Sequence, residues 1–140
     1  MIKEKYVSLK IAKLLKEKGF SEQTTTFYYW DSTDYKVVHC FQNDENEVNY
    51  FKNEKENEIE IAAPTQQLVL RWLREEKNIH IYALPILAST KKYGHGDWEA
   101  VICYVDSGID ATIGGNGHIY GLTYEEAVEF AILYSLENLV

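Results

Sequence analysis

Residues 123–140 constrain the fold more than any other part of the chain. Thr123-Tyr-Glu-Glu126 is a capping-box pattern, in which the threonine hydroxyl accepts the third helical N–H and the glutamate reaches back to the cap. Small or apolar residues then recur at helical spacing on one broad face, at Tyr124, Ala127, Val128, Ala131, Ile132, Ser135, Leu136 and Leu139. The pattern predicts a helix over residues 123–138 that is docked on a folded domain.

Two more helices are predicted, over residues 8–18 and 64–77. Ser8 is a good N-cap, and Gly19 is a good residue to follow the last turn of the first helix. Pro64 opens the second helix, where its missing N–H costs no hydrogen bond. We expect each helix to bury one apolar stripe, formed by Val7, Ile11, Leu14 and Leu15 in the first and by Leu68, Val69, Trp72 and Leu73 in the second.

The strands are predicted to pair mainly in antiparallel fashion. Residues 24–30 and 35–41 flank the turn Asp31-Ser-Thr-Asp34 and form a hairpin. Further extended segments are expected at 58–62, at 79–87, where Pro85 either breaks the strand or places it at a sheet edge, and at 98–105 in a central position. The glycine-rich residues 109–121 leave little room for a strand. We therefore predict an α+β fold in which a sheet of about 4–5 strands packs against three helices, as a single domain over residues 1–140.

Charge is distributed unevenly along the chain. The formal net charge is −8 over 140 residues. Residues 1–20 hold six lysines and two acidic residues, whereas residues 96–140 hold eight acidic residues and no lysine or arginine. Phosphate contacts require Lys and Arg, so we expect no direct binding of nucleic acid.

The cysteines and the hydropathy pattern indicate a compartment. Cys40 and Cys103 lie in apolar, strand-like surroundings, and two cysteines make no disulfide framework. Buried free thiols suit a reducing cytoplasm. The N-terminal residues hold no hydrophobic signal core, and no apolar run approaches the ~20 residues of a membrane span. We therefore expect a cytoplasmic protein without a membrane partner, in a bacterium or in a phage-infected cell.

Histidine and cysteine spacing matches no metal or nucleophile motif. The sequence has no H-x-x-x-H and no C-x-x-C among its histidines and cysteines, which are His39, His80, His95, His118, Cys40 and Cys103. A pair formed across two strands by His80 and Cys103 has feasible geometry, but a packed thiol beside a hydrogen-bonded imidazole explains both residues equally well. His95-Gly-Asp97 brings a carboxylate near an imidazole, with no nucleophile nearby.

The glycine-rich run Gly114-Gly-Asn-Gly117 resembles a phosphate cradle only superficially. A dinucleotide loop needs a helix that opens directly on its glycines, and here the predicted helix begins later, at Thr123. Residues 96–140 also hold no lysine or arginine to meet a phosphate. We predict no catalytic residue, no cofactor and no metal site, and we favour a non-catalytic protein over a small enzyme.

The acidic stretch 44–60 carries seven carboxylates, with Lys52 and Lys55 among them. It lacks the ordered ligands and the central glycine of a calcium loop. Two interpretations stay open at this point. The stretch is either a solvated loop or a mimic of nucleic-acid phosphates that occupies the DNA site of an enzyme.

Three segments together resemble a family of small uncharacterised proteins encoded by phages and prophages of gut anaerobic bacteria. The segments are residues 7–20 (VSLKIAKLLKEKGF), residues 63–81 (APTQQLVLRWLREEKNIHI) and residues 122–128 (LTYEEAV) continuing to the C-terminus. Residues 21–62 and the glycine-rich loop lie outside the resemblance. The family has no established activity, so the resemblance implies a mobile-element origin and a small accessory role, and it assigns no catalytic residue.

These observations leave three functional hypotheses. The first is a phage or prophage accessory protein that acts through protein–protein interaction, and the second is an acidic inhibitor of a host nucleic-acid enzyme. The third is a small enzyme that uses His80, His95 or Cys103.

A candidate interface lies on the C-terminal helix, where Phe130, Leu133 and Tyr134 fall opposite the buried stripe. Glu126 and Glu137 share that side. A symmetric homodimer or a host or phage protein would cover it. The alternative is that residues 42–58 of the same chain fold over these side chains.

Overall fold

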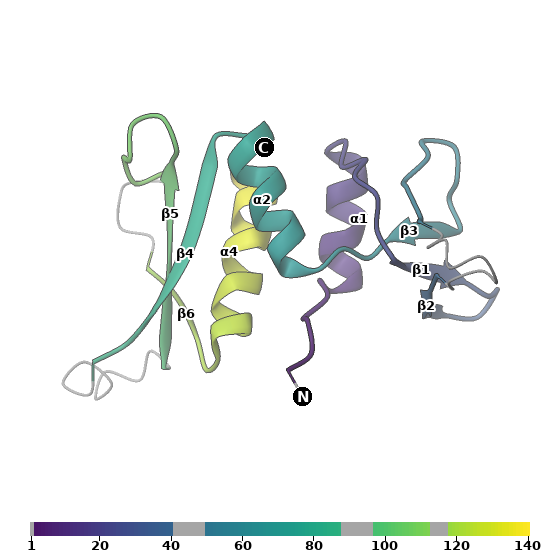
Figure 1. The fold of residues 1–140 in the computed structure, drawn as a ribbon, viewed down its shortest axis with the longest axis horizontal. Coiled ribbons are helices and arrows are strands. Elements are labelled where there is room, and N and C mark those ends of the chain that lie inside the picture. Colours follow the sequence, from purple (N-terminus) through teal and green to yellow (C-terminus); the bar gives the residue numbers. More distant parts are fainter. Residues whose placement is uncertain (1, 41–49, 88–96, 113–117) are drawn as a thin grey trace. The chain divides into compact units, whose positions relative to one another are not determined.

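The computed structural model describes residues 2–40, 50–87, 97–112 and 118–140. The chain forms two compact units, Met1–Thr65 and Gln66–Val140. The first unit contains α1 (Leu9–Glu17), β1 (Thr26–Trp30), β2 (Tyr35–His39) and β3 (Glu60–Ala62) (Figure 1). The second unit contains α2 (Gln66–Glu76), β4 (Ile79–Pro85), β5 (Trp98–Tyr104), β6 (Ile119–Gly121) and α4 (Tyr124–Asn138).

The α+β class is confirmed, but the arrangement of the strands differs from the prediction. In place of one sheet of 4–5 strands, the described residues form two three-stranded antiparallel sheets, ordered β2-β1-β3 and β4-β5-β6. The sheets are separate because β3 pairs with β1, which lies earlier in the chain, and forms no ladder with β4, which follows it. The single-domain organisation stays a prediction.

In the first unit, the predicted hairpin is confirmed. Trp30 lies opposite Tyr35, and Asp31 closes the turn by accepting hydrogen bonds from the N–H groups of Thr33 and Asp34, each at 3.0 Å. Lys36 Nζ lies 2.6 Å from the Asp31 carboxylate. Hydrogen bonds from Lys36 and Thr33 hold the pKa of Asp31 well below its ordinary value.

The helix of the first unit begins and ends as its sequence predicts. Ser8 Oγ accepts a hydrogen bond from the Ile11 N–H at 3.3 Å, and Gly19 takes the left-handed conformation after the last turn, with φ of 87°. Ile11, Ala12 and Leu15 are buried on one face of α1. This face anchors the helix in the small core that it shares with β3.

In the second unit, α2 and α4 pack against one face of the β4-β5-β6 sheet (Figure 1). Helix α4 contacts all three strands, and α2 contacts β4. Ile79, Ile81, Ala100 and Ile102 point into the resulting core and are at most 5% exposed. The central position predicted for the strand near residue 98 and the edge position predicted for Pro85 are both confirmed, because β5 lies between β4 and β6.

The prediction that residues 109–121 have little room for a strand is wrong. Ile119–Gly121 form β6, whose residues lie opposite Trp98, Glu99 and Ala100 of β5. A further bridge joins Asp110 to Cys103. Strand β6 has only three residues, and it is held in place by pairing with β5 and by packing on α4. Neither of these contacts is visible in a local sequence pattern.

The three predicted helices are present within two residues of their predicted ends. The buried residues of α4 are Ala127, Val128, Ala131, Ile132, Ser135 and Leu136, all of which belong to the predicted stripe. Thr123 Oγ1 accepts a hydrogen bond from the Glu126 N–H at 3.1 Å. Glu126 Oε1 in turn accepts one from the Leu122 N–H at 3.3 Å, one residue before the Thr123 N–H that the capping box predicts as the donor.

Replacing Thr123 with alanine is expected to lower the free energy of unfolding by about 1 kcal/mol. The Glu126 N–H loses its side-chain acceptor at the first turn of α4. Thr123→Ser keeps the oxygen and serves as the matched control, with an expected loss of only a few tenths of that amount. Urea denaturation of both variants checks the difference, and equal losses would show that the cap contributes no stability.

Candidate functional site

The three residues of the predicted interface lie on one side of α4, away from its buried stripe. Phe130 is 46% exposed, whereas Leu133 and Tyr134 are half-buried. These three side chains line an open groove with a volume of about 390 Å³. We call it the α4–β6 groove, because it is lined by Phe130, Leu133, Tyr134, Glu137 and Asn138 from α4 and by His118, Ile119 and Tyr120 at β6.

The strand side of the α4–β6 groove carries an electrostatic cluster. His118 Nδ1 contacts Glu99 Oε1 on the neighbouring strand, and the His118 and Tyr120 rings stack with centroids 5.9 Å apart. Burial raises the pKa of the Tyr120 hydroxyl, with a further contribution from the Glu99 carboxylate. The cluster therefore presents one imidazole, one neutral phenol and one carboxylate.

The groove residues of α4 lie outside the buried stripe that holds the second unit together. Ala131 and Ile132 of α4 are fully buried, and the groove residues Phe130 and Leu133 stand directly before and after them in the sequence. Gln66 at the start of α2 donates hydrogen bonds to the Glu125 carbonyl at 2.8 Å and to the Glu129 carboxylate at 2.9 Å. Helix α4 is thus fixed to its own unit by residues that lie outside the groove lining.

His80 and Cys103, the pair considered for catalysis, lie on the neighbouring strands β4 and β5. The register of β4 and β5 places the two residues directly opposite each other. Both side chains are half-buried, and among the described residues no hydrogen bond joins the imidazole and the thiol. The small enzyme that would use this pair stays a hypothesis.

The other candidate groups for chemistry have structural partners or lie outside the described residues. His39 Nδ1 lies 3.0 Å from Thr26 Oγ1, across the first hairpin. Burial raises the pKa of the Cys40 thiol, which makes this sulfur a poorer nucleophile. His95 and residues 114–117 lie outside the described residues, as do residues 42–49 of the segment considered as a cover for the α4 side chains.

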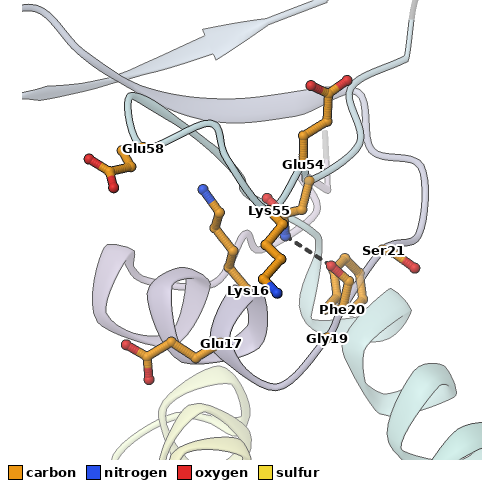
Figure 2. A pocket seen from close by; sticks show the side chains of 9 residues that line it. Lys16, Glu17, Gly19, Phe20, Ser21, Glu54, Lys55 and Glu58 are labelled. Atoms are coloured by element: carbon orange, nitrogen blue, oxygen red, sulfur yellow. Dashed lines mark hydrogen bonds between the residues drawn. The ribbon is translucent and has the colours of Figure 1, made fainter.

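A second hollow, of about 700 Å³, lies in the first unit at the C-terminal end of α1 (Figure 2). Two asparagines organise the chain around it. Asn53 donates to the Phe20 carbonyl at 3.0 Å and accepts from the Ala62 N–H at 2.8 Å, and Asn57 Oδ1 accepts from the Glu60 N–H at 3.0 Å. Lys16 Nζ donates to the Asn57 carbonyl. These contacts tie residues 53–60 to the helix end and to β3.

Charges of both signs surround this hollow. Lys16 and Lys55 lie among Glu17, Glu54 and Glu58, and most of these side chains are exposed (Figure 2). Such a rim is well solvated and favours neither an anion nor a cation. Lysines also interrupt the described carboxylates of residues 50–60. This part of the acidic stretch therefore does not form the continuous acidic surface that a nucleic-acid mimic would present.

Across residues 2–40, 50–87, 97–112 and 118–140, no three His, Cys, Asp or Glu side chains come together as a metal site would require. None of the described helices combines the length and the apolar character needed to cross a membrane.

Comparison with known proteins finds no match to this chain among family models, curated proteins or solved structures. The lining of the α4–β6 groove combines aromatic, aliphatic and acidic groups without a lysine or arginine. This composition is typical of a surface that contacts another molecule through rings and a few polar groups.

Sequence reasoning identified one wall of the groove and missed the other. Phe130, Leu133 and Tyr134 could be found because a helical wheel separates them from the buried stripe. The sequence predicts a loop that includes His118, Ile119 and Tyr120, so it does not predict their position beside α4. The signal that could have located them is the alternation of polar and apolar residues at 118–121, which is too short to be distinctive.

Proposed function

We propose that this chain is a non-catalytic accessory protein that binds another protein through the α4–β6 groove. The observation that carries the proposal is the convergence of Phe130, Leu133 and Tyr134 with Ile119 and Tyr120 in one surface groove, outside the core of the second unit. Such residues are conspicuous on a surface because solvent-exposed aromatic clusters are uncommon unless they serve recognition.

The composition of the groove supports recognition rather than chemistry. Aromatic side chains are enriched at the centres of protein interfaces, and they supply large contact areas at a low cost in side-chain entropy. Glu137 and Asn138 provide polar groups at the same groove. Its volume of about 390 Å³ lies within the range of small-molecule pockets, but the groove is open to solvent, which suits an inserted side chain of a partner protein.

The accessory role and the cellular setting rest on the sequence. The resemblance to phage- and prophage-encoded proteins supports an origin in a mobile element. Two isolated cysteines without a disulfide framework support action in the cytoplasm. The partner would then be a protein of the host cell or of the phage, or a second copy of the chain.

Affinity capture in the bacterium that encodes the chain tests the proposal. The wild type is compared with the double variant Phe130→Ser/Leu133→Ser and with a control, Tyr82→Ser/Leu84→Ser. The control residues lie on the open face of β4 and are 40% and 52% exposed. We expect one captured protein that the control retains and the groove variant loses. The same set of captured proteins from all three would refute the proposal.

Light scattering tests whether the partner is a second copy. If the groove mediates a symmetric dimer, the wild type is dimeric and Phe130→Ser/Leu133→Ser is monomeric with an unchanged melting temperature. Because Phe130 is 46% exposed, its replacement should leave the core intact. A wild type that is monomeric at high micromolar concentration excludes the symmetric dimer and leaves a different protein as the partner.

A further inference from the structure

We propose that the first unit binds a second copy of the chain by strand addition, in which β2 of one copy pairs in antiparallel fashion with β2 of the other. The surface is the outer edge of the β2-β1-β3 sheet, and it is not part of the α4–β6 groove. The inference is carried by the direction of the backbone hydrogen bonds in the first hairpin and by the exposure of β2.

The backbone groups at three positions of β2 point away from β1. Just beyond the end of β2, the Cys40 N–H donates to the Thr25 carbonyl at 2.7 Å. Bonded positions alternate along an antiparallel ladder, so Lys36 and Val38 also bond β1. The N–H and carbonyl groups of the remaining residues lie on the outer edge, and these residues are Tyr35, Val37 and His39. Within the described part of the chain, no hydrogen bond reaches these outward groups.

Among the described residues, β2 is the edge strand most open to pairing. Val37 at its centre is 51% exposed, and α1 packs over β3, at the opposite edge of the sheet. Strand β4 also lies at an edge, but Ile79 and Ile81 are at most 5% exposed, and Pro85 has no N–H to donate. Strands β3 and β6 have three residues each, which limits the pairing that they could offer.

The edge formed by β2 has little of the protection that proteins commonly give to exposed edges. Such edges are blocked by proline, by a bulge or by charged side chains, of which lysine is the most frequent. Strand β2 contains no proline, and it pairs with β1 without a bulge. Its one lysine, Lys36, is paired with the Asp31 carboxylate at 2.6 Å in the same hairpin. An open edge of this kind accepts an added strand through main-chain hydrogen bonds.

A second copy of β2 satisfies the whole edge. When two β2 strands pair about a two-fold axis at Val37, the two Val37 residues lie opposite each other, and Tyr35 of each copy lies opposite His39 of the other. In that register each copy donates three hydrogen bonds from its outward N–H groups and accepts three at its outward carbonyls. The pattern of donors and acceptors along the edge is therefore complementary to itself.

The charges also permit this pairing. Lys36 of one copy lies opposite Val38 of the other, so the two lysines do not face each other across the new ladder. Antiparallel order places the acidic turns, residues 31–34, at opposite ends of the paired strands. Residues 1–40 hold seven lysines and five acidic residues, so the negative charge of the chain is not concentrated here. Two copies can thus approach without the repulsion of like charges.

Sedimentation equilibrium of the full chain tests the inference. Strand pairing alone buries a small area, so we expect a weak dimer whose fraction rises as the protein concentration approaches about 1 mM. Val37→Pro removes an N–H that faces away from β1, and proline is tolerated at such positions of an edge strand. Two central hydrogen bonds are lost, one from each copy, so the dimer should weaken about tenfold. The control Val37→Thr keeps the N–H and should associate like the wild type.

Amide hydrogen exchange of the wild type, followed by NMR, needs no variant. Exchange at the three outward amides of β2 should slow as the protein concentration rises, because each N–H gains an acceptor in the dimer. The amides of Lys36 and Val38 are the internal control, since they bond β1 in either state. Their exchange should change much less with concentration, so the expected signature is an alternation along the strand.

Four results would overturn the inference. They are a wild type that stays monomeric at the highest concentration, a dimer that Val37→Pro leaves intact, a dimer that is lost in Phe130→Ser/Leu133→Ser, and exchange at the outward amides that does not respond to concentration. Protection that appears only after a different protein is added would give the edge another occupant, and it would also refute the second copy. Capture of a partner through the α4–β6 groove is measured separately, so either proposal can fail while the other stands.

Discussion

Replacing Ile132 with alanine is expected to lower the free energy of unfolding by about 2–5 kcal/mol. Ile132 is fully buried on α4, the helix that contacts all three strands of its sheet. The substitution removes apolar atoms from the core and leaves a cavity, because the neighbouring helix and strands can close around it only in part. Chemical denaturation of the purified variant measures the loss.

The adjacent residue provides a matched control on the same helix. Leu133 is half-buried and lines the α4–β6 groove, so Leu133→Ala should cost less than half as much as Ile132→Ala. Trp72, which is 6% exposed on α2, should resemble Ile132 and lose stability in the same range on replacement by alanine. If Ile132→Ala and Leu133→Ala melt alike, the assignment of core and groove faces on α4 is wrong.

Helices were predictable from this sequence because their determinants are local. Ser8 and Thr123 are side-chain caps within three residues of the N–H groups that they satisfy, and apolar residues repeat at the helical period between the ends. The hairpin of β1 and β2 was predictable for the same reason, since Asp31 forms its turn with the next few residues.

The division into two sheets was not predictable, because it depends on pairing between distant segments. Ile61 of β3 lies opposite Tyr28 of β1, across a connection of more than thirty residues, while β4 pairs with β5 instead. The backbone groups of an extended segment can bond any other extended segment, so local composition does not select the partner strand. Tertiary packing makes that choice, and the second wall of the groove follows from it.

The glycine at the end of β6 is a single residue that a long-range contact requires. Within the pattern of the sequence, Gly121 is one of several glycines before the last helix. In the structure, it is the point at which β6 meets the first turn of α4, opposite Trp98 in the sheet. The absence of a side chain at this position allows the strand and the first turn of the helix to approach closely.

Replacing Gly121 with alanine is therefore expected to destabilise the second unit by about 1–3 kcal/mol or more. A Cβ at this position would lie 2.8 Å from Ala127 Cα and 2.9 Å from the Glu126 carbonyl carbon, and closer still to the Ala127 nitrogen. These are backbone atoms of α4, so no side-chain rotation relieves the clash. The helix must move away from β6, and the amide signals of residues at the start of α4 and along the groove should shift.

Gly108→Ala is the control that separates crowding from backbone strain. Gly108 has a φ of 67° and no neighbouring atom within 4 Å of an added Cβ, so its replacement costs only the left-handed strain of about 1–2 kcal/mol. It should leave the signals of α4 and the groove in place. Gly121→Ala has the opposite signature, because its effect arises from contact with α4. A Gly121→Ala variant that leaves the α4 signals unchanged would mean that the helix does not approach β6 as closely as the structure shows. The placement of α4 beside β6 would then be wrong.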